Sequence, residues 1–174
     1  MAVLPIITAP DKRLKLKSEP VKTVDAETAK LMEDMLETMY LAPGVGLSAP
    51  QVGIAKRIIV VDVGKSEGER APYRMVDPEL VWTSEELSIY EEGCLSLPEY
   101  YADVERPDRV FIKYLDETNM ERELEAEGLL ATCIQHEMDH LDGMLFVDHL
   151  TSLKRNMILR KLQKAKRFKA AKAE

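Results

Sequence analysis

A regular hydrophobic pattern predicts a helix from about residue 25 to residue 41. Apolar side chains recur there every three or four residues, so one face of the helix is apolar and belongs in the core. Asp25 is a suitable N-cap, Glu27 suits the positive end of the helix dipole, and Pro43 ends the segment. The apolar face consists of Met32, Met35, Leu36 and Met39.

Residues 44–51 interrupt this regularity. Their sequence, GVGLSAPQ, is rich in Gly and Pro and predicts a loop without regular secondary structure. Further along, short runs rich in Val, Ile, Tyr and Phe indicate β-strands. We expect these strands at residues 58–63, 74–82, 86–91, 110–115 and 120–127.

Two more helices are predicted in the second half of the chain. Residues 129–141 have helical apolar spacing and end at Gly143, a suitable C-terminal residue for a helix. A last helix begins near residue 151, and its apolar pattern is lost in the Lys- and Ala-rich sequence that follows. Because the strands cluster between helices instead of alternating with them, the pattern favours an α+β fold.

Length and composition indicate one globular domain. The chain has 174 residues and 45% apolar residues, and no linker divides it. We expect a single domain over residues 1–168 and a basic, disordered tail at 169–174. Two cysteines make no disulfide framework, no signal peptide is evident, and no apolar run approaches the ~20 residues that cross a bilayer. We therefore expect a cytoplasmic protein without a membrane partner, and a monomer.

The net charge of −7 is unevenly distributed. Residues 154–174 hold nine Lys or Arg against Glu174 alone, which gives this segment +8 and leaves −15 on the rest of the chain. The acidic body would repel DNA, whereas the basic end would attract an anionic partner. A solvated, frayed tail would have the same composition, so both interpretations stay open.

The predicted helix at 129–141 contains the strongest candidate for chemistry, His136-Glu137-Met138-Asp139-His140. Residues four apart on a helix differ by about 40° in direction and about 6 Å in height, so both imidazoles can hold one metal ion. Glu137 could accept a proton from a water molecule that the ion activates. The same string also occurs by chance on helical surfaces, but the apolar residues before it predict a buried helix.

A catalytic ion usually has three protein ligands, so a third is needed from Cys94, Cys133 or His149. Cys133 lies about 7.5 Å below the midpoint of the two histidines along the helix axis, too far for a thiolate bond of ~2.3 Å. It would instead line a pocket or pack in the core. His149 follows the helix and could be an ordinary surface histidine. Cys94 remains, in the segment EEGCLSLP at 91–98, where a glycine allows an unusual turn and a proline limits strand pairing.

Three segments together resemble peptide deformylase. They are GVGLSAPQ at 44–51, EGCLS at 92–96 and QHEMDH at 135–140, in the family's order and spacing. The resemblance implies antiparallel sheets packed around a central metal-binding helix, with N-terminal and C-terminal helices. It also implies removal of the N-formyl group from the initiator methionine of nascent polypeptides, with release of formate.

The resemblance assigns roles to individual residues. It implies one metal ion, Fe(II) in the cell with Ni, Co or Zn as substitutes, bound by Cys94, His136 and His140. Glu137 would take a proton from metal-bound water and return it to the departing amine. The Gln51 amide and the Leu95 backbone N–H would stabilise the oxyanion. The resemblance also places substrate-binding groups at Val45, Gly46, Tyr90, Gly93, Leu129, Thr132 and Cys133.

Two positions depart from the family pattern, and a third matches it. Ser48 stands where the family usually has alanine, and Tyr101 stands where many bacterial members have an arginine at the cleft rim. Arg106 matches a family arginine that we expect to pair with Glu92 behind the metal ligands. The basic C-terminal helix resembles that of members that dock on the ribosome, which makes the ribosome a candidate partner.

Two other classes of function stay open from sequence alone. A zinc peptidase would use the same pair of histidines with Glu137, but it would take a third ligand further along the chain and would not need Cys94. A non-catalytic metal-stabilised or ribosome-binding module would need a closed site with a fourth protein ligand, for which no strong candidate exists.

Overall fold

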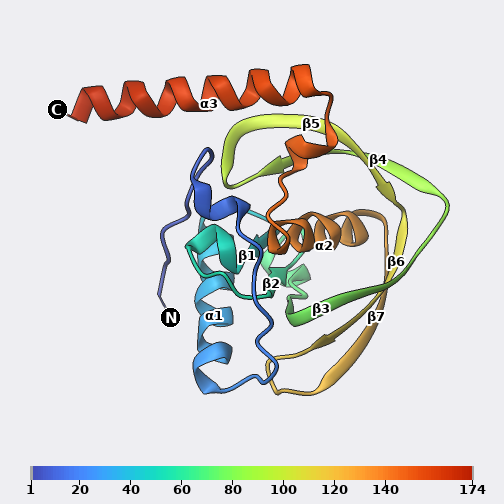
Figure 1. Ribbon diagram of the computed structural model, residues 1–174. Helices are drawn as coiled ribbons and strands as arrows, with labels where there is room; N and C mark the ends of the chain where they lie inside the picture. The colour runs from blue at the N-terminus through green and yellow to red at the C-terminus, as the bar shows by residue number, and fades with distance from the viewer. Residues whose placement is uncertain (1, 174) are drawn as a thin grey trace.

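The computed structural model describes residues 2–173 and has an α+β architecture, as predicted (Figure 1). Helix α1 spans Ala26–Leu41, α2 spans Gly128–Leu141, and α3 spans Ser152–Ala173. The strands are β1 Gly46–Ser48, β2 Ile58–Val61, β3 Tyr73–Thr83, β4 Leu87–Cys94, β5 Leu97–Pro107, β6 Arg109–Leu115 and β7 Glu121–Glu127. No helix within residues 2–173 is both long and apolar enough to cross a membrane.

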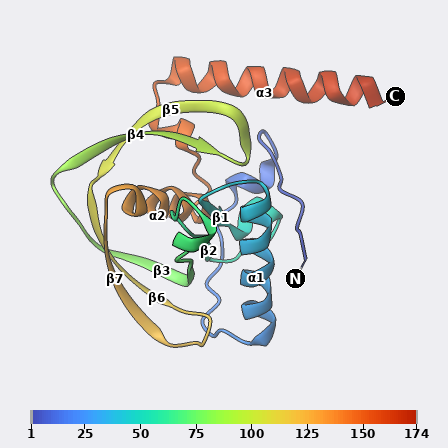
Figure 2. The same ribbon diagram turned by 180° about the vertical axis from the view of Figure 1, so that it is seen from behind.

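The strands form two antiparallel sheets on either side of α2. One has the order β1-β2-β3-β6-β7, and the other is the β4–β5 hairpin. Both views show α2 near the middle of the molecule, with the β4–β5 hairpin between it and α3 (Figures 1 and 2). Helix α2 is thus enclosed by both sheets.

Strand β2 explains why the five-stranded sheet is covered on both faces. Alternate side chains of a strand point to opposite faces. Ile58 and Val60 pack in a cluster with α1, whereas Ile59 and Val61 pack in a cluster with α2. All four side chains are fully buried, which accounts for a continuous apolar run in place of an alternating one.

The predicted loop at 44–51 was wrong in part. Residues Gly46–Ser48 form β1, and Ala49–Val52 form a 3-10 helix. Strand β1 exists because Gly46 pairs with Val61 and Ser48 with Ile59 on the strongly apolar β2. A remote partner therefore overrides the local preference of Gly and Pro for a loop.

Pro98 limits strand pairing, as expected. Cys94 pairs with Leu97 and Gly93 with Tyr101, so residues 98–100 have no register partner in β4. One expectation about the limits of elements was wrong. Helix α3 continues through 169–173, where a disordered tail was expected, since Ala and Lys are good helix formers. Residue 174 of that expected tail lies outside the described residues.

Candidate metal centre and substrate cleft

Helix α2 and the end of β4 bring three potential metal ligands together. One donor atom each from Cys94, His136 and His140 lies within 4.8 Å of the other two. The Cys94 Sγ is 3.4 Å from the His140 Nε2. Both histidines are buried, at 7% and 0% exposure. Two imidazoles and a thiolate suit a transition-metal ion, so the residues present fit the implied cofactor.

The other two ligand candidates from the sequence do not join this group. Cys133 lines the adjacent cleft, and burial raises the pKa of its thiol to about 12, so it stays protonated. His149 instead places its Nε2 2.8 Å from the Asp139 Oδ2. The structure therefore selects Cys94 as the third member of the group.

A buried ion pair orients the His136 ring. The His136 Nδ1 is 2.9 Å from the Glu92 Oε1, which leaves its Nε2 free for an ion. Arg106 donates to both Glu92 oxygens, from Nε at 2.7 Å and from Nη2 at 2.9 Å, which confirms the predicted pair. Burial raises the pKa of Glu92, but its hydrogen bonds with His136 and Arg106 outweigh this effect. The net shift of the pKa is downward, so Glu92 stays ionised.

The environment of His140 keeps it neutral. Complete burial and the neighbouring His136 hold the pKa of His140 well below its usual value. A neutral imidazole has the lone pair that a metal ion requires. Its Nδ1 is buried and without a hydrogen-bond partner among the described residues.

Glu137 has the properties of a general base beside this centre. Its Oε1 lies 3.9 Å from the His136 Nε2, and its Oε2 is buried without a partner among the described residues. Burial raises the pKa of Glu137 to about 7, although the His136 charge opposes the shift. A carboxyl group with a pKa near neutrality can both take up and return a proton.

Gln51 reaches the centre from the 3-10 helix after β1. Its Oε1 accepts from the Ser48 backbone N at 2.9 Å and from the Ser48 Oγ at 3.0 Å. Its Nε2 donates to the Ser96 Oγ at 3.1 Å and lies 3.5 Å from the Cys94 Sγ. The serine in place of the family's usual alanine thus adds a second hydrogen bond that orients this amide.

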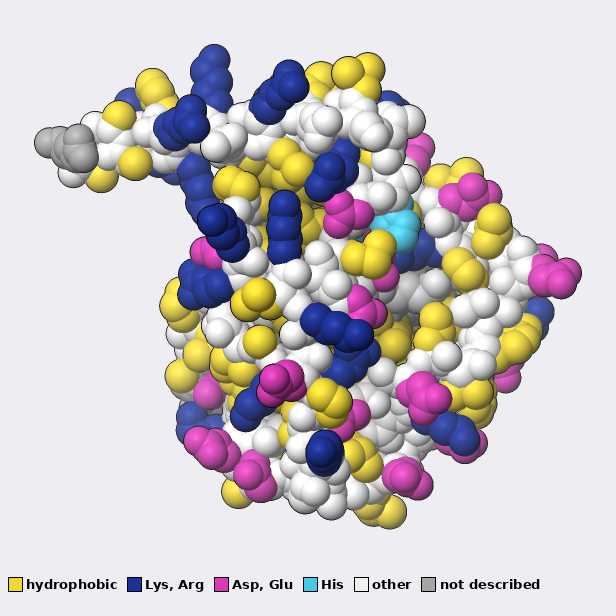
Figure 3. Space-filling model, viewed as in Figure 1, with side chains coloured by type: hydrophobic (Ala, Val, Ile, Leu, Met, Phe, Trp, Pro, Cys, Tyr) yellow, Lys and Arg dark blue, Asp and Glu magenta, His cyan; other side chains and the backbone are white. Residues whose placement is uncertain are grey.

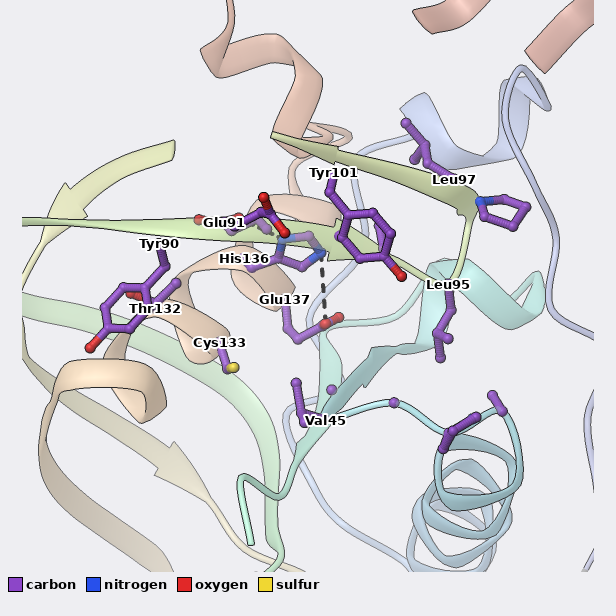
Figure 4. A pocket seen from close by; sticks show the side chains of 18 of the residues that line it. Val45, Tyr90, Glu91, Leu95, Leu97, Tyr101, Thr132, Cys133, His136 and Glu137 are labelled. Carbon is purple, nitrogen blue, oxygen red and sulfur yellow. Dashed lines mark hydrogen bonds and ion pairs between the residues drawn. The ribbon is translucent and has the colours of Figure 1, made fainter. Parts of the chain in front are cut away.

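A cleft of about 630 Å³ opens in front of these residues (Figure 4). Glu137, Leu95 and all seven predicted substrate-binding residues line it, whereas Gln51 and His140 are buried and are not among its lining residues. Figure 4 shows Tyr90, Thr132 and Cys133 toward one side of the cleft and Leu95 and Leu97 toward the other. The predicted residues that line the cleft are Val45, Gly46, Tyr90, Gly93, Leu129, Thr132 and Cys133.

Gly93 lies at an irregularity of the hairpin, as expected, although its φ is not positive. The β4–β5 register shifts between Gly93 and Cys94. A Cβ at this position would also meet the ring of Tyr101, which pairs with Gly93 across the hairpin. The sequence interpretation also missed Leu97, Pro98 and Glu99 in the cleft wall, because β5 was not predicted. Pairing of 97–107 with the predicted strand at 86–91 would have revealed them.

Comparison with known proteins agrees with this geometry. The family model for polypeptide deformylase matches residues 3–156. The chain belongs to the peptide deformylase family. A relative from Methylocella silvestris is 54% identical over 173 residues, covering 98% of this chain and 88% of its own length. One from Rhizobium meliloti is 51% identical, covering 99% of both chains. Both are peptide deformylases by name.

Solved structures of the family have the same fold. Peptide deformylase from Ehrlichia chaffeensis superposes with a TM-score of 0.92 at 41% identity, covering 97% of this chain and 99% of its own. The same enzyme in complex with actinonin superposes with a TM-score of 0.90 at 43% identity, covering 96% of this chain and 99% of its own. The resemblance inferred from three sequence segments is thereby confirmed, and the chain is a hydrolase of the peptide deformylase class.

Proposed function

We propose that Cys94, His136 and His140 bind one metal ion and that the chain removes the N-formyl group from the initiator methionine of nascent polypeptides, releasing formate. The observation that carries this proposal is the convergence of three donor atoms within 4.8 Å beside an open cleft. Fe(II) is the proposed ion, and Ni, Co or Zn suits the same mixture of imidazole and thiolate. When bound, such an ion polarises a carbonyl group and lowers the pKa of the attacking water.

Glu137 is proposed to move the proton. Its unpartnered oxygen and its pKa of about 7 suit uptake of a proton from water during attack on the formyl carbon. The same carboxyl then returns the proton to the amine as the C–N bond breaks. Formate and a free N-terminal methionine are the products.

Gln51 and Leu95 are proposed to stabilise the negative charge that develops on the formyl oxygen. Ser48 and Ser96 orient the Gln51 amide from both ends, so its N–H needs no reorganisation during the reaction. Leu95 follows Cys94 directly and lines the cleft, so its backbone N–H is the second proposed donor.

The substrate is proposed to bind as an extended peptide between two strand edges. Strand β1 lies at the edge of the five-stranded sheet, and within residues 2–173 β4 is paired only with β5. Val45, Gly46 and Gly93 all line the cleft, so their backbone groups can pair with a peptide. The methionine side chain would enter the part lined by Tyr90, Leu129 and Cys133.

An assay with formyl-Met-Ala-Ser and anaerobic, iron-loaded protein tests this function. We expect rapid formate release and no cleavage of unformylated peptides, which separates a deformylase from a zinc peptidase. Glu137→Gln should lower kcat by on the order of 100-fold or more, because general acid–base catalysis contributes roughly 10²–10⁴-fold. The matched control Glu123→Gln, on the exposed surface of β7, should retain full activity. No formate release from verified holo-protein would refute the function.

We also propose the ribosome as a partner of α3. This helix buries only Ile158 and Leu162 among its described residues, and Figure 3 shows Lys and Arg side chains along its exposed length. Such a cationic surface binds RNA phosphates in a salt-dependent manner. Replacing exposed Lys161, Lys164 and Lys169 by Gln should weaken ribosome co-sedimentation at low salt, whereas three Gln replacements on the body should not. Equal loss from both sets would refute a specific role of α3.

A further inference from the structure

The hydrogen bonds behind His136 continue beyond Glu92 and Arg106. The Arg106 Nη1 donates to the Asp139 Oδ2 at 2.8 Å. The same Asp139 oxygen lies 2.8 Å from the His149 Nε2. A continuous chain of contacts therefore connects a buried metal ligand with the surface. In order, its members are His136, Glu92, Arg106, Asp139 and His149.

Exposure increases from Arg106 outward to His149. The side chains of Glu92 and Arg106 are both 5% exposed, Asp139 is 22% exposed and His149 is 30% exposed. The outer end is supplied by the 3-10 helix Phe146–His149, which follows α2. The Phe146 ring of the same 3-10 helix stacks on the His136 ring, with centroids 6.2 Å apart. The 3-10 helix is thus connected to His136 in two ways, directly by the packing of Phe146 and indirectly by the hydrogen bonds that begin at His149.

The charges explain why the outer contact matters. Arg106 is a single cation between two carboxylates, Glu92 and Asp139, and its three donating nitrogens are divided between them. A donor from His149 holds the Asp139 oxygen in place. Without it, Asp139 would be free to shift and draw Arg106 away from its two-point contact with Glu92.

We propose that His149 is a positioning residue, which acts through Asp139, Arg106 and Glu92 to keep the His136 ring in its ligating orientation. The inference rests on the proposed metal site. It predicts that His149 slows the loss of a bound ion although it lies outside the cleft and contacts no ligand.

The rate at which a chelator removes Co²⁺ tests this role. Co²⁺-loaded protein is mixed with excess EDTA, and the loss of its visible absorption is followed. His149→Leu should accelerate the loss on the order of 10-fold, the low end of the roughly 10–100-fold effects of residues that support metal ligands. His149→Gln should restore the wild-type rate, because its amide N–H can replace the Nε2 donor. His149→Asn, whose amide is shorter, should behave like Leu with less disturbance of folding.

Two controls separate positioning from general stability. Arg155→Leu breaks the Arg155–Asp148 pair, which begins in the same 3-10 helix but does not reach His136, and should leave the rate unchanged. In an Asp139→Ala background, His149→Leu should cause no further acceleration, since the connection is already broken. Wild-type rates for both His149→Leu and His149→Asn would overturn the inference, as would equal acceleration by Arg155→Leu. Undiminished Co²⁺ binding by Cys94→Ser would instead refute the metal site itself.

Discussion

At the scale of single residues, the sequence predicted which side chains form the metal centre, but not why a glycine is required beside it. The spacing of His136 and His140 on a helix predicted their shared face, and the structure has both beside Cys94. The reason for Gly46 could not be read from sequence. It depends on β1 approaching α2 so closely that a Cβ at this position would lie 2.6 Å from the Glu137 Oε1.

Gly46→Ala should therefore damage catalysis while leaving the fold intact. The added methyl group would displace the Glu137 carboxylate, and a misplacement of about 1 Å can cost on the order of 100-fold in rate. Steady-state kinetics with formyl-Met-Ala-Ser, together with circular dichroism, measures both effects. Gly68→Ala is the matched control, because a Cβ there meets no atom within 4 Å. Full activity of Gly46→Ala would contradict the proposed position of the base.

At the scale of elements, periodicity predicted the helices and failed for strands that depend on remote partners. Helix α1 was expected at 25–41 and occupies Ala26–Leu41, because its apolar stripe and its Asp25 cap are local features. Strands β1 and β5 were missed. Strand β5 contains two prolines, Pro98 and Pro107, and a single β-branched residue, Val104, so only its pairing with β4 makes it a strand.

The turn between β6 and β7 gives a prediction for acid stability. Burial raises the pKa of Asp116, but hydrogen bonds from Thr118, Arg122 and the Met120 backbone outweigh it, so the net shift is downward. A carboxyl with a lowered pKa in the folded state stabilises the fold above the unfolded value of 3.8, and this contribution is lost as the pH falls.

Asp116→Asn should consequently lower the free energy of unfolding at pH 7 by about 1.5–3 kcal/mol, the usual contribution of hydrogen bonds to a charged group. The difference from wild type should shrink as the pH falls below 4. Urea unfolding at pH 7 and pH 3 measures it, with Asp103→Asn on the exposed face of β5 as the control. A difference that is independent of pH would contradict the assigned role of the Asp116 charge.

At the scale of the whole molecule, the site is an assembly of segments far apart in the chain. Gln51, Cys94 and His136 come from a 3-10 helix, the end of β4 and α2, and only the fold brings them to one centre. From composition and periodicity alone, Cys94 could be chosen as the third ligand only by setting aside Cys133 and His149. The three family segments made Cys94 predictable as a ligand, because together they indicate which segments, distant in sequence, lie close together in the fold. The contact between Asp139 and His149 belongs to no such segment and required the structure.

The most direct test of the account is a crystal structure of the metal-loaded chain with anomalous scattering recorded at the absorption edge of the ion. We predict one strong peak per chain, bonded to the sulfur of Cys94 and to a ring nitrogen of each of His136 and His140, and open to the cleft beside Glu137. A peak elsewhere, or a Cys94 sulfur turned away from both imidazoles with no ion between them, would contradict the account.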